Sequence, residues 1–539
     1  MTNVPRRASR LRNPVFLLAV AAGLIAFAVQ SGELGSDDTN HRLQSAHAFW
    51  TSEPPVFPNE WPDFGVHGHN GKLQSYYGIG QSLLMLPFDI VATGIERLPI
   101  FASYRGNDPT IRHIVVSYSV SILVNALTAL VCFRLLMQFG FSVRQSVAGT
   151  LGLLVLTTHL HYTQNMMENN YICLLSLAGL CWQYEWLRTG SRRALAIGSA
   201  AFGLNLLTRL TTGMDLFSGG VFLLLVFWLE GVRGRALWAK CRTYLAVALP
   251  VYAFFGLIDR LYQFYRFGSF FSTYMSVTAR ETLARNPNWP RNYPFETPFR
   301  IGFEGALFWA EKSVFLIDPL LVLMAILCFV AWRRFAPAVK AYVITMSVLL
   351  LEYVCFYAKY TVWSGDSAWG DRYVSTTAEL AALLAVPLLL RHRAQVGRVV
   401  WSAGVALIAW SAVVQAASVA FWLSLELYQM EKFGHPTFVV GLRLENIVAF
   451  ALGKMDAWGL ATGTMKEDPW DYMHITSWNL LPFQLRRAGV APAWVVDVTL
   501  AMWYASLGAL AWVLLRLRQV LATGNEPANP PTRQAAKRR

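Results

Sequence analysis

The sequence predicts an all-α polytopic membrane protein with about twelve transmembrane helices. Of its 539 residues, 55% are hydrophobic and only 14% are charged, and the mean hydropathy is +0.37. Soluble globular chains carry about 25% charged residues, so this chain has too few to cover a surface that faces water. Apolar runs close to the roughly 20 residues that cross a bilayer recur along the chain. These observations exclude an ordinary soluble enzyme.

The excess of basic residues indicates membrane orientation. Lys and Arg number 46 against 32 Asp and Glu, which gives a formal net charge of +14. The excess lies in short loops and at both termini, and the positive-inside rule places such segments in the cytoplasm. We therefore expect no nucleic-acid partner. We expect a protein of the bacterial inner (plasma) membrane with both termini cytoplasmic and membrane lipids around it.

The six cysteines lie in or beside apolar segments and form no CxxC motif. We interpret them as small core residues rather than as disulfides or metal ligands. They are Cys132, Cys173, Cys181, Cys241, Cys328 and Cys355.

The first apolar run extends from Pro14 to Gln30 and follows a basic start. Such a start also fits a cleaved signal peptide, but we interpret it as an uncleaved anchor, and either choice places residue 31 outside. Residues 31–113 then form a long first outer loop. Within this loop, residues 78–90 are too few to cross and include Pro87, so they predict a re-entrant or interfacial segment.

The later spans alternate with short basic loops. We expect them near residues 114–138, 147–160, up to 188, 194–210, 214–229, 244–262, 314–332, 341–360, up to 391, 400–423 and 493–515. With this number of spans, every Arg-rich short loop falls on one side. The long loops 31–113, 263–313 and 425–492 all fall on the other side, which we expect to be extracytoplasmic and to carry interfacial helices.

An acidic pair, Asp37 and Asp38, directly follows the first apolar run. Leu43, Ala46 and Trp50 come next at helical spacing, so either acid fits the N-terminal cap of an interfacial helix. A carboxylate at the outer surface is also placed to act as a general base toward an acceptor hydroxyl. The two roles are compatible, because a helix N-terminus favours an ionised carboxylate and a nearby phosphate. Which acid is the base stays open, with Asp37 slightly preferred.

Four polar residues follow in the same loop: Lys72, Tyr76, Tyr77 and Gln81. Tyrosine is common in interfacial belts, so an ordinary belt is one interpretation. A lysine just ahead of a membrane-dipping helix is also well placed to meet a lipid phosphate as a point charge.

His67 and His69 form an HxH motif in the first outer loop. Together with Asp37 or Asp38 they could hold a divalent metal, but no third ligand is defined. A metal cofactor is therefore possible but not favoured.

The outer end of the span near 341–360 carries a cluster of polar and aromatic residues. They are Trp363, Asp366, Trp369, Asp371, Arg372 and Tyr373. Arginine binds a phosphate bidentately, and aromatic faces suit a pyranose ring. Elsewhere on the outer side, Arg209 and Asp215 at the tip of a hairpin resemble a local ion pair, although Arg209 could reach the same site.

Four stretches stand in order along residues 30–390. They are GSDDTNHRLQSAHAF, YYGIGQSLLMLPF, RFGSFFSTY with the later GFEGALFWAEKSVFLIDPLL, and WSGDSAWGDRY. In these stretches the chain resembles GT-C-type glycosyltransferases, the polyprenyl-phosphate-sugar-dependent transferases that include protein mannosyltransferases and aminoarabinose transferases. It departs from their pattern at Asp366 and Asp371, where small residues or proline are usual, and residues 425–492 match nothing in it.

The resemblance implies a transmembrane catalytic core over residues 1–424, an outer segment of unassigned role at 425–492, a last span at 493–516 and a basic, disordered cytoplasmic tail at 517–539.

The resemblance also implies hexosyl or pentosyl transfer with inversion, from a polyprenyl-phosphate donor to a glycan, lipid or protein acceptor. A carboxylate at Asp37 or Asp38 takes the acceptor proton, and basic residues hold the departing phosphate. The expected phosphate-binding residues are Lys72, Arg372 and, with less support, Arg209. The expected substrate-binding residues are Tyr76, Tyr77, Gln81, Trp363, Asp366, Trp369, Asp371 and Tyr373.

Two other classes are weighed against this one. A transporter or flippase of lipid-linked glycans should carry ionisable residues near the bilayer midplane, whereas here the acids and bases lie mostly at the outer rim, with Glu352 as an exception. A polymerase or ligase of such glycans would need different loop motifs.

Overall fold

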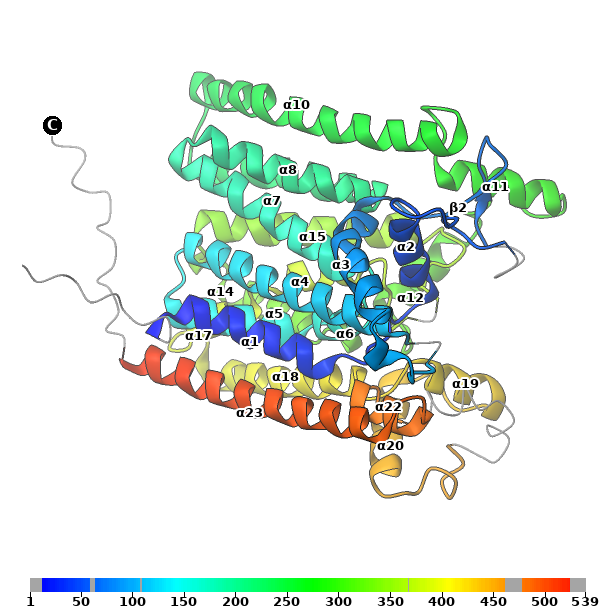
Figure 1. Cartoon of the computed structure of the whole chain (residues 1–539). Helices are drawn as coiled ribbons and strands as arrows, with labels where there is room; N and C mark the ends of the chain where they lie inside the picture. The colour runs from blue at the N-terminus through cyan, green and yellow to red at the C-terminus, as the bar shows by residue number, and fades with distance from the viewer. Residues whose placement is uncertain (1–11, 59–63, 107–108, 367, 461–476, 524–539) are drawn as a thin grey trace, which may run out of the picture.

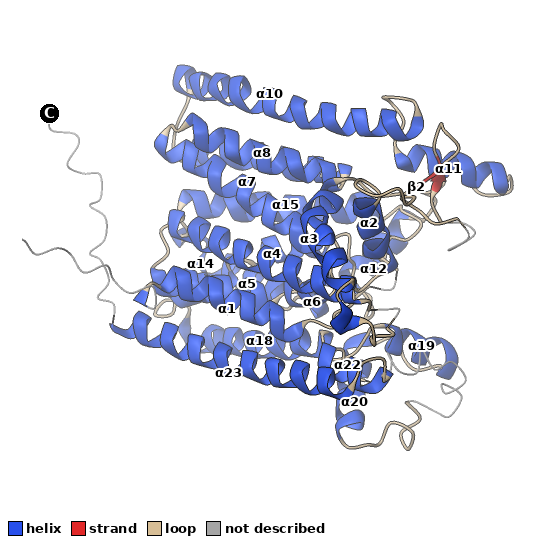
Figure 2. Ribbon diagram, viewed as in Figure 1, coloured by secondary structure: helices blue, strands red, loops and turns tan. Residues whose placement is uncertain are grey.

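The computed structural model describes residues 12–58, 64–106, 109–366, 368–460 and 477–523. Long helices run side by side in one bundle, and short helices gather at the end of the bundle to the right in Figure 1. Almost everything described is helical, as Figure 2 shows. The sequence predicts a disordered tail from residue 517, but residues 517–523 continue the helix α23 Ala493–Thr523, and the tail lies outside the described residues from 524 onward.

The bundle helices are α1 Pro14–Val29, α4 Ile111–Gln138, α5 Val143–Leu156, α7 Asn169–Thr189, α8 Arg192–Thr208, α9 Gly213–Leu229, α10 Gly234–Phe267, α14 Leu320–Ala331, α15 Pro337–Tyr357, α16 Ser375–Ala382, α17 Ala385–Arg391, α18 Gly397–Ser418 and α23 Ala493–Thr523. The other helices are α2 Asp37–His47, α3 Gly80–Glu96, α6 His159–Gln164, α11 Tyr274–Arg285, α12 Phe299–Phe308, α13 Val314–Ile317, α19 Ser424–Phe433, α20 Val439–Ala451 and α22 Leu481–Ala488. A small antiparallel hairpin pairs β1 Val66–His67 with β2 Leu73–Gln74.

The chain is an integral membrane protein of helical type. In the described part, six helices are long and apolar enough to cross a bilayer, namely α4, α9 with the turn before it, α10, α15, α18 and α23. The shorter helices α1 and α5 are apolar as well. The helical membrane class is thus confirmed, while the number of about twelve spans stays a prediction.

Two segments that the sequence predicts as single spans are interrupted. The segment at 314–332 is divided at Asp318 and Pro319 into α13 and α14. The segment that ends at Arg391 is divided between α16 and α17. Proline explains both breaks: Pro319 has no N–H to continue a helix, and Pro387 cannot donate to the carbonyl of Leu383, four residues earlier, against which its ring clashes.

The predicted re-entrant segment is the helix α3, which continues past residue 90 to Glu96 and packs along α4 and α2. Its start approaches the end of α8 so closely that a Cβ on Gly80 would lie 2.7 Å from the backbone nitrogen of Thr208. A glycine is therefore required at this crossing.

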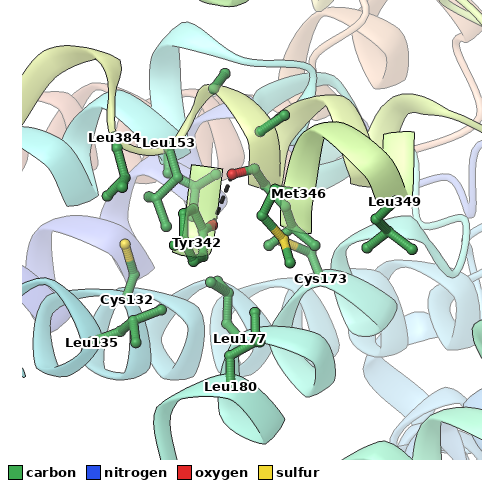
Figure 3. Packing of buried hydrophobic residues seen from close by; sticks show 14 of the residues in the cluster. Cys132, Leu135, Leu153, Cys173, Leu177, Leu180, Tyr342, Met346, Leu349 and Leu384 are labelled. Carbon is green, nitrogen blue, oxygen red and sulfur yellow. Dashed lines mark hydrogen bonds between the residues drawn. The ribbon is translucent and has the colours of Figure 1, made fainter. Parts of the chain in front are cut away.

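The largest apolar core joins α4, α7, α14, α15 and α16. Figure 3 shows Cys132 and Cys173 among its leucines, together with Tyr342, whose hydroxyl donates to the carbonyl of Leu380 at 2.8 Å. Cys181 is also buried, and all six cysteines are free thiols. The prediction that the cysteines form no disulfide is confirmed.

Candidate active site

A cavity of about 540 Å³, here called the outer cavity, opens among the short helices and loops that include α2, α11 and residues 356–373. Its charged lining residues are Asp38, Arg42, Glu168, Arg209, Glu281, Arg285 and Arg372. Its aromatic lining residues are Tyr76, Tyr77, Tyr274, Trp289, Tyr293, Phe295, Phe356, Tyr357, Tyr360 and Tyr373. The cavity therefore combines a charged floor with aromatic walls.

Asp38 lies in the first turn of α2, whose N-cap is Ser36 rather than either aspartate. Its Oδ1 accepts a hydrogen bond from the Tyr77 hydroxyl at 2.6 Å, and its Oδ2 accepts from Arg372 Nη1 at 2.7 Å. The Asp38 side chain remains 25% exposed to the cavity. Burial alone would raise the pKa of Asp38, but Arg372, Arg42 and the Tyr77 hydroxyl outweigh it and hold the pKa below its usual value.

Glu168 joins two arginines on the cavity floor. It occupies the N-cap position of α7 without a capping hydrogen bond, and its carboxylate forms ion pairs with Arg42, at 2.6 Å, and with Arg209. The guanidinium of Arg42 also lies 4.0 Å from the centre of the Tyr77 ring. Against the effect of burial, Arg209 and Arg42 hold the pKa of Glu168 far below its usual value.

The predicted ion pair between Arg209 and Asp215 is wrong. Arg209 has an extended backbone at the end of α8 and points to Glu168. Asp215 lies one short turn further on, in the first turn of α9, and accepts from the hydroxyls of Ser176 and Tyr353. The turn between the two helices sends the side chains in different directions, so nearness in sequence does not make them partners.

Arg372 follows a loop whose backbone carbonyls accept hydrogen bonds from Lys312. Lys312 is buried, and its Nζ donates to the carbonyls of Asp366 at 2.8 Å, Ala368 at 2.9 Å and Gly370 at 3.3 Å. Next to it, the buried Asp371 accepts from the backbone N–H of Tyr373 at 2.9 Å. Burial raises the pKa of Asp371 to about 7. Lys312 is thus a positioning residue for the segment that presents Arg372.

The structure brings six of the predicted site residues together in the outer cavity. They are Asp38, Tyr76, Tyr77, Arg209, Arg372 and Tyr373. Asp37 is exposed on α2 and does not line the cavity, so the preference for Asp37 over Asp38 reverses. Lys72 is exposed beside β2 and also lies outside the cavity lining, which removes the support for its role as a phosphate ligand.

Several predicted substrate-binding residues support the site instead of lining it. Gln81 is buried and donates to the carbonyl of Met166 at 2.8 Å. Trp363 packs edge-on against Trp309, with ring centres 5.5 Å apart. Trp369 is fully buried, with the guanidinium of Arg443 5.2 Å from its ring centre.

Asp366 and Asp371 lie outside the cavity lining as well. In a segment with glycines at positive φ, successive side chains turn to different sides, so only Arg372 and Tyr373 of this cluster reach the cavity.

Sequence reasoning missed Arg42, Glu168 and four tyrosines of the lining. Arg42 was detectable, because it lies one helical turn after Asp38 and therefore on the same face of α2. Tyr357 stacks on Tyr373 with ring centres 4.3 Å apart and forms one aromatic wall with Tyr360. No sequence signal links these tyrosines to Asp38.

The HxH motif does not form a metal site with the acidic pair. The ring of His67 faces Glu281, with 3.2 Å between Nδ1 and Oε2, and is more than half exposed. Among the described residues, the one group of three ligand-type side chains lies elsewhere, in the core.

Two solved structures are similar to this one. ArnT from Cupriavidus metallidurans bound to undecaprenyl phosphate matches with a TM-score of 0.44 and 14% identity, over 94% of this chain and 77% of ArnT. The archaeal oligosaccharyltransferase AglB from Archaeoglobus fulgidus, in complex with an inhibitory peptide and a dolichol-phosphate, matches with a TM-score of 0.44 and 14% identity, over 76% of this chain and 56% of AglB.

No family model and no curated protein matches the sequence. At 14% identity and a TM-score of 0.44, the two structural matches assign neither a family nor an activity to the chain.

Proposed function

We propose that this chain is a membrane glycosyltransferase that moves a sugar from a polyprenyl-phosphate donor to an acceptor hydroxyl, with inversion at the anomeric carbon. The observation that carries the proposal is a partly exposed Asp38 carboxylate, ion-paired with Arg372, in one tyrosine-lined cavity with the guanidiniums of Arg42 and Arg209. The active site faces the extracytoplasmic side of a bacterial inner membrane, and both termini are cytoplasmic.

The arginines have hydrogen-bond donors to spare for a phosphate. Arg372 gives one N–H to Asp38 and another to the Tyr373 hydroxyl at 3.4 Å, while its buried Nε has no partner. Nη1 of the buried Arg42 has no partner either. Buried donors without partners cost free energy, and a small turn of either side chain toward the cavity would let a bound oxyanion satisfy them.

Asp38 is the general base in this mechanism. The acceptor hydroxyl loses its proton to Asp38 as its oxygen forms the new bond to the anomeric carbon. The bond between that carbon and the phosphate oxygen breaks on the opposite face, and the electron pair leaves with the phosphate. Arginines next to the leaving oxygen stabilise the charge that develops on it. The lowered pKa keeps Asp38 ionised and ready to accept the proton.

Asp38→Asn tests the proposal, with Asp37→Asn as the matched control one residue away. Full-length protein in liposomes is supplied with a panel of polyprenyl-phosphate sugars and a cell-envelope extract, and mass spectrometry reads the products. We expect Asp38→Asn to lower turnover by about a hundred- to ten-thousandfold, the usual contribution of a general base. Asp37→Asn should keep the wild-type rate. Full activity of Asp38→Asn would refute this mechanism.

A transporter of lipid-linked glycans is the second candidate, and one observation favours it. Asp318 and Glu379 are buried in the two interrupted segments, and transporters place ionisable groups and broken helices at their binding sites. The two candidates differ in product. A transporter moves the donor across liposomes without making a new glycosidic bond, whereas a transferase forms that bond without needing translocation.

A further inference from the structure

Three side chains with metal-ligating atoms meet in the core, on the helices that continue inward from the outer cavity. They are His159 of α6, Cys173 of α7 and Glu379 of α16, and all three are fully buried. One imidazole nitrogen, the thiol sulfur and one carboxylate oxygen all lie within 4.8 Å of one another. Nothing in the proposed glycosyl transfer uses these groups.

The hydrogen bonds around His159 leave one of its ring nitrogens without a partner. Nε2 lies 3.0 Å from Asn125 Oδ1, and the Asn125 amide is oriented by donation from its Nδ2 to the carbonyl of Ala22. Nε2 therefore carries the proton, and the neutral ring presents the Nδ1 lone pair. This lone pair faces Glu379 Oε2 at 3.4 Å and has no hydrogen-bond partner, while the Cys173 thiol, a weak donor, is the other group beside the Glu379 carboxylate. Two acceptors that face each other in a buried place need a cation or a proton between them.

A second acid, Asp318, is buried beside this group. Asp318 accepts from the backbone N–H of Thr158 at 2.7 Å, and its Oδ2 lies 3.0 Å from the Thr158 hydroxyl. The same hydroxyl lies 3.1 Å from Glu379 Oε1, although it has only one proton to donate. In the described part of the chain, no arginine or lysine forms an ion pair with either acid. The cluster is short of positive charge.

We propose that His159, Cys173 and Glu379 bind one zinc ion. Nitrogen, thiolate sulfur and carboxylate oxygen are the donor atoms of protein zinc sites, where donors stand about 3.5 Å apart around a tetrahedral ion. A thiolate and a carboxylate balance the double charge of zinc, so the site becomes neutral in its buried surroundings. Asn125 forms a hydrogen bond with His159 and Thr158 forms one with Glu379, so both ligands are oriented by neighbours, as metal ligands usually are.

The position of this zinc site gives it a structural role. Glu168, on the cavity floor, directly precedes α7, and Cys173 follows five residues later on this helix. Arg372 directly precedes the segment that leads into α16, which carries Glu379. A metal between these helices ties the two sides of the outer cavity together from within the core.

Metal analysis of the full-length protein, purified in detergent without a metal-affinity step, tests the proposal. We expect about one zinc per chain in the wild type and a loss of zinc in Cys173→Ser. Cys132→Ser is the matched control, because Cys132 is equally buried in the same core and belongs to no ligand group. Cys132→Ser should keep its zinc.

Cobalt gives a second readout that does not depend on how the variants fold. After zinc is removed from the wild type by a chelator, added Co²⁺ should produce a thiolate-to-cobalt charge-transfer band, and added Zn²⁺ should raise the melting temperature. A wild-type protein that contains no zinc and takes up neither Zn²⁺ nor Co²⁺ would overturn the proposal. The cluster would then be an ordinary proton-sharing pair of His159 and Glu379. The zinc site does not rest on the proposed transferase activity.

Discussion

At the scale of single residues, Asp38 shows how neighbours set the state of a candidate base. Its carboxylate is partly removed from water, which by itself favours the protonated form. Arg372 and Arg42 supply positive charge, and the Tyr77 hydroxyl donates a short hydrogen bond to the ionised form. The sum favours the carboxylate and lowers the pKa of Asp38.

Tyr77→Phe should raise the pKa of Asp38, because it removes a hydrogen bond that favours the ionised form. In the wild type, the acidic limb of kcat/KM lies below the usual aspartate value of about 3.9, since activity is lost only as the pH falls through the lowered pKa. In Tyr77→Phe this limb should move to higher pH. A pH profile of kcat/KM measures the shift.

Tyr76→Phe is the control for this profile, because the Tyr76 hydroxyl bonds the backbone of Gly65 and not Asp38. Its acidic limb should coincide with that of the wild type. If the acidic limbs of the kcat/KM profiles coincide in the wild type, Tyr77→Phe and Tyr76→Phe, then the protonation of Asp38 does not control the rate.

At the scale of elements, the crossing of α3 and α8 links a helix of the first outer loop to the arginine on the cavity floor. Gly80 begins α3 and touches Thr208, the residue before Arg209. Any side chain on Gly80 would force α8 and α3 apart. Because Arg209 directly follows Thr208, this displacement would also move Arg209.

Gly80→Ala should therefore destabilise the protein by about 1–3 kcal/mol, the usual cost of overpacking, and also lower transfer activity. Gly94→Ala is the matched control in the same helix, because a Cβ there meets nothing within 4 Å. It should be neutral or stabilising by about 0.5–1 kcal/mol. Thermal unfolding and initial rates of both variants check this. If Gly80→Ala and Gly94→Ala have the same melting temperature and the same initial rate, then α3 and α8 can move apart at Gly80 without loss of stability or activity.

The sequence predicts long elements better than their interruptions. Apolar runs identify α4, α15 and α23 because length and hydropathy suffice to recognise a span. Pro387 predicts a break in its helix, because proline lacks an N–H. The apolar residues on both sides of Pro387 nevertheless give the hydropathy of one continuous span. The interior placement of α6 follows from packing that no local pattern records.

The candidate site was predictable where it depends on motifs and not where it depends on side-chain direction. The first and fourth sequence stretches contain Asp38 and Arg372, which pair across 334 positions of the chain. Glu168 and Arg209 pair only because two helix ends meet, and Trp369 enters the core only because its loop turns inward. Such directions are set by tertiary structure.

At the scale of the whole molecule, the short helices that surround the cavity lie at one end of the bundle, opposite the start of α1 and the end of α23 in Figure 1. If the positive-inside rule holds, this end faces out of the cell. Residues 31–113, 263–313 and 425–492 then all lie outside with Arg372.

Cysteine labelling tests this orientation with two exposed positions, Lys72 in the first outer loop and Arg235 at the start of α10. In a protein with Cys241→Ser, a membrane-impermeant maleimide should label Lys72→Cys on intact cells. Arg235→Cys should react only after the membrane is opened. The reverse pattern would invert the topology and place the cavity in the cytoplasm.

The ion pairs of the outer cavity also bear on the donor that it selects. Its described lining contains four arginines and three carboxylates, so its net charge is only +1. A sugar linked through one phosphate carries a single negative charge and makes the loaded cavity neutral. A sugar linked through a pyrophosphate carries at least one charge more, which this low-dielectric site would leave without a partner. If the chain is the transferase proposed above, we therefore expect it to use donors linked through one phosphate in preference to pyrophosphate-linked donors.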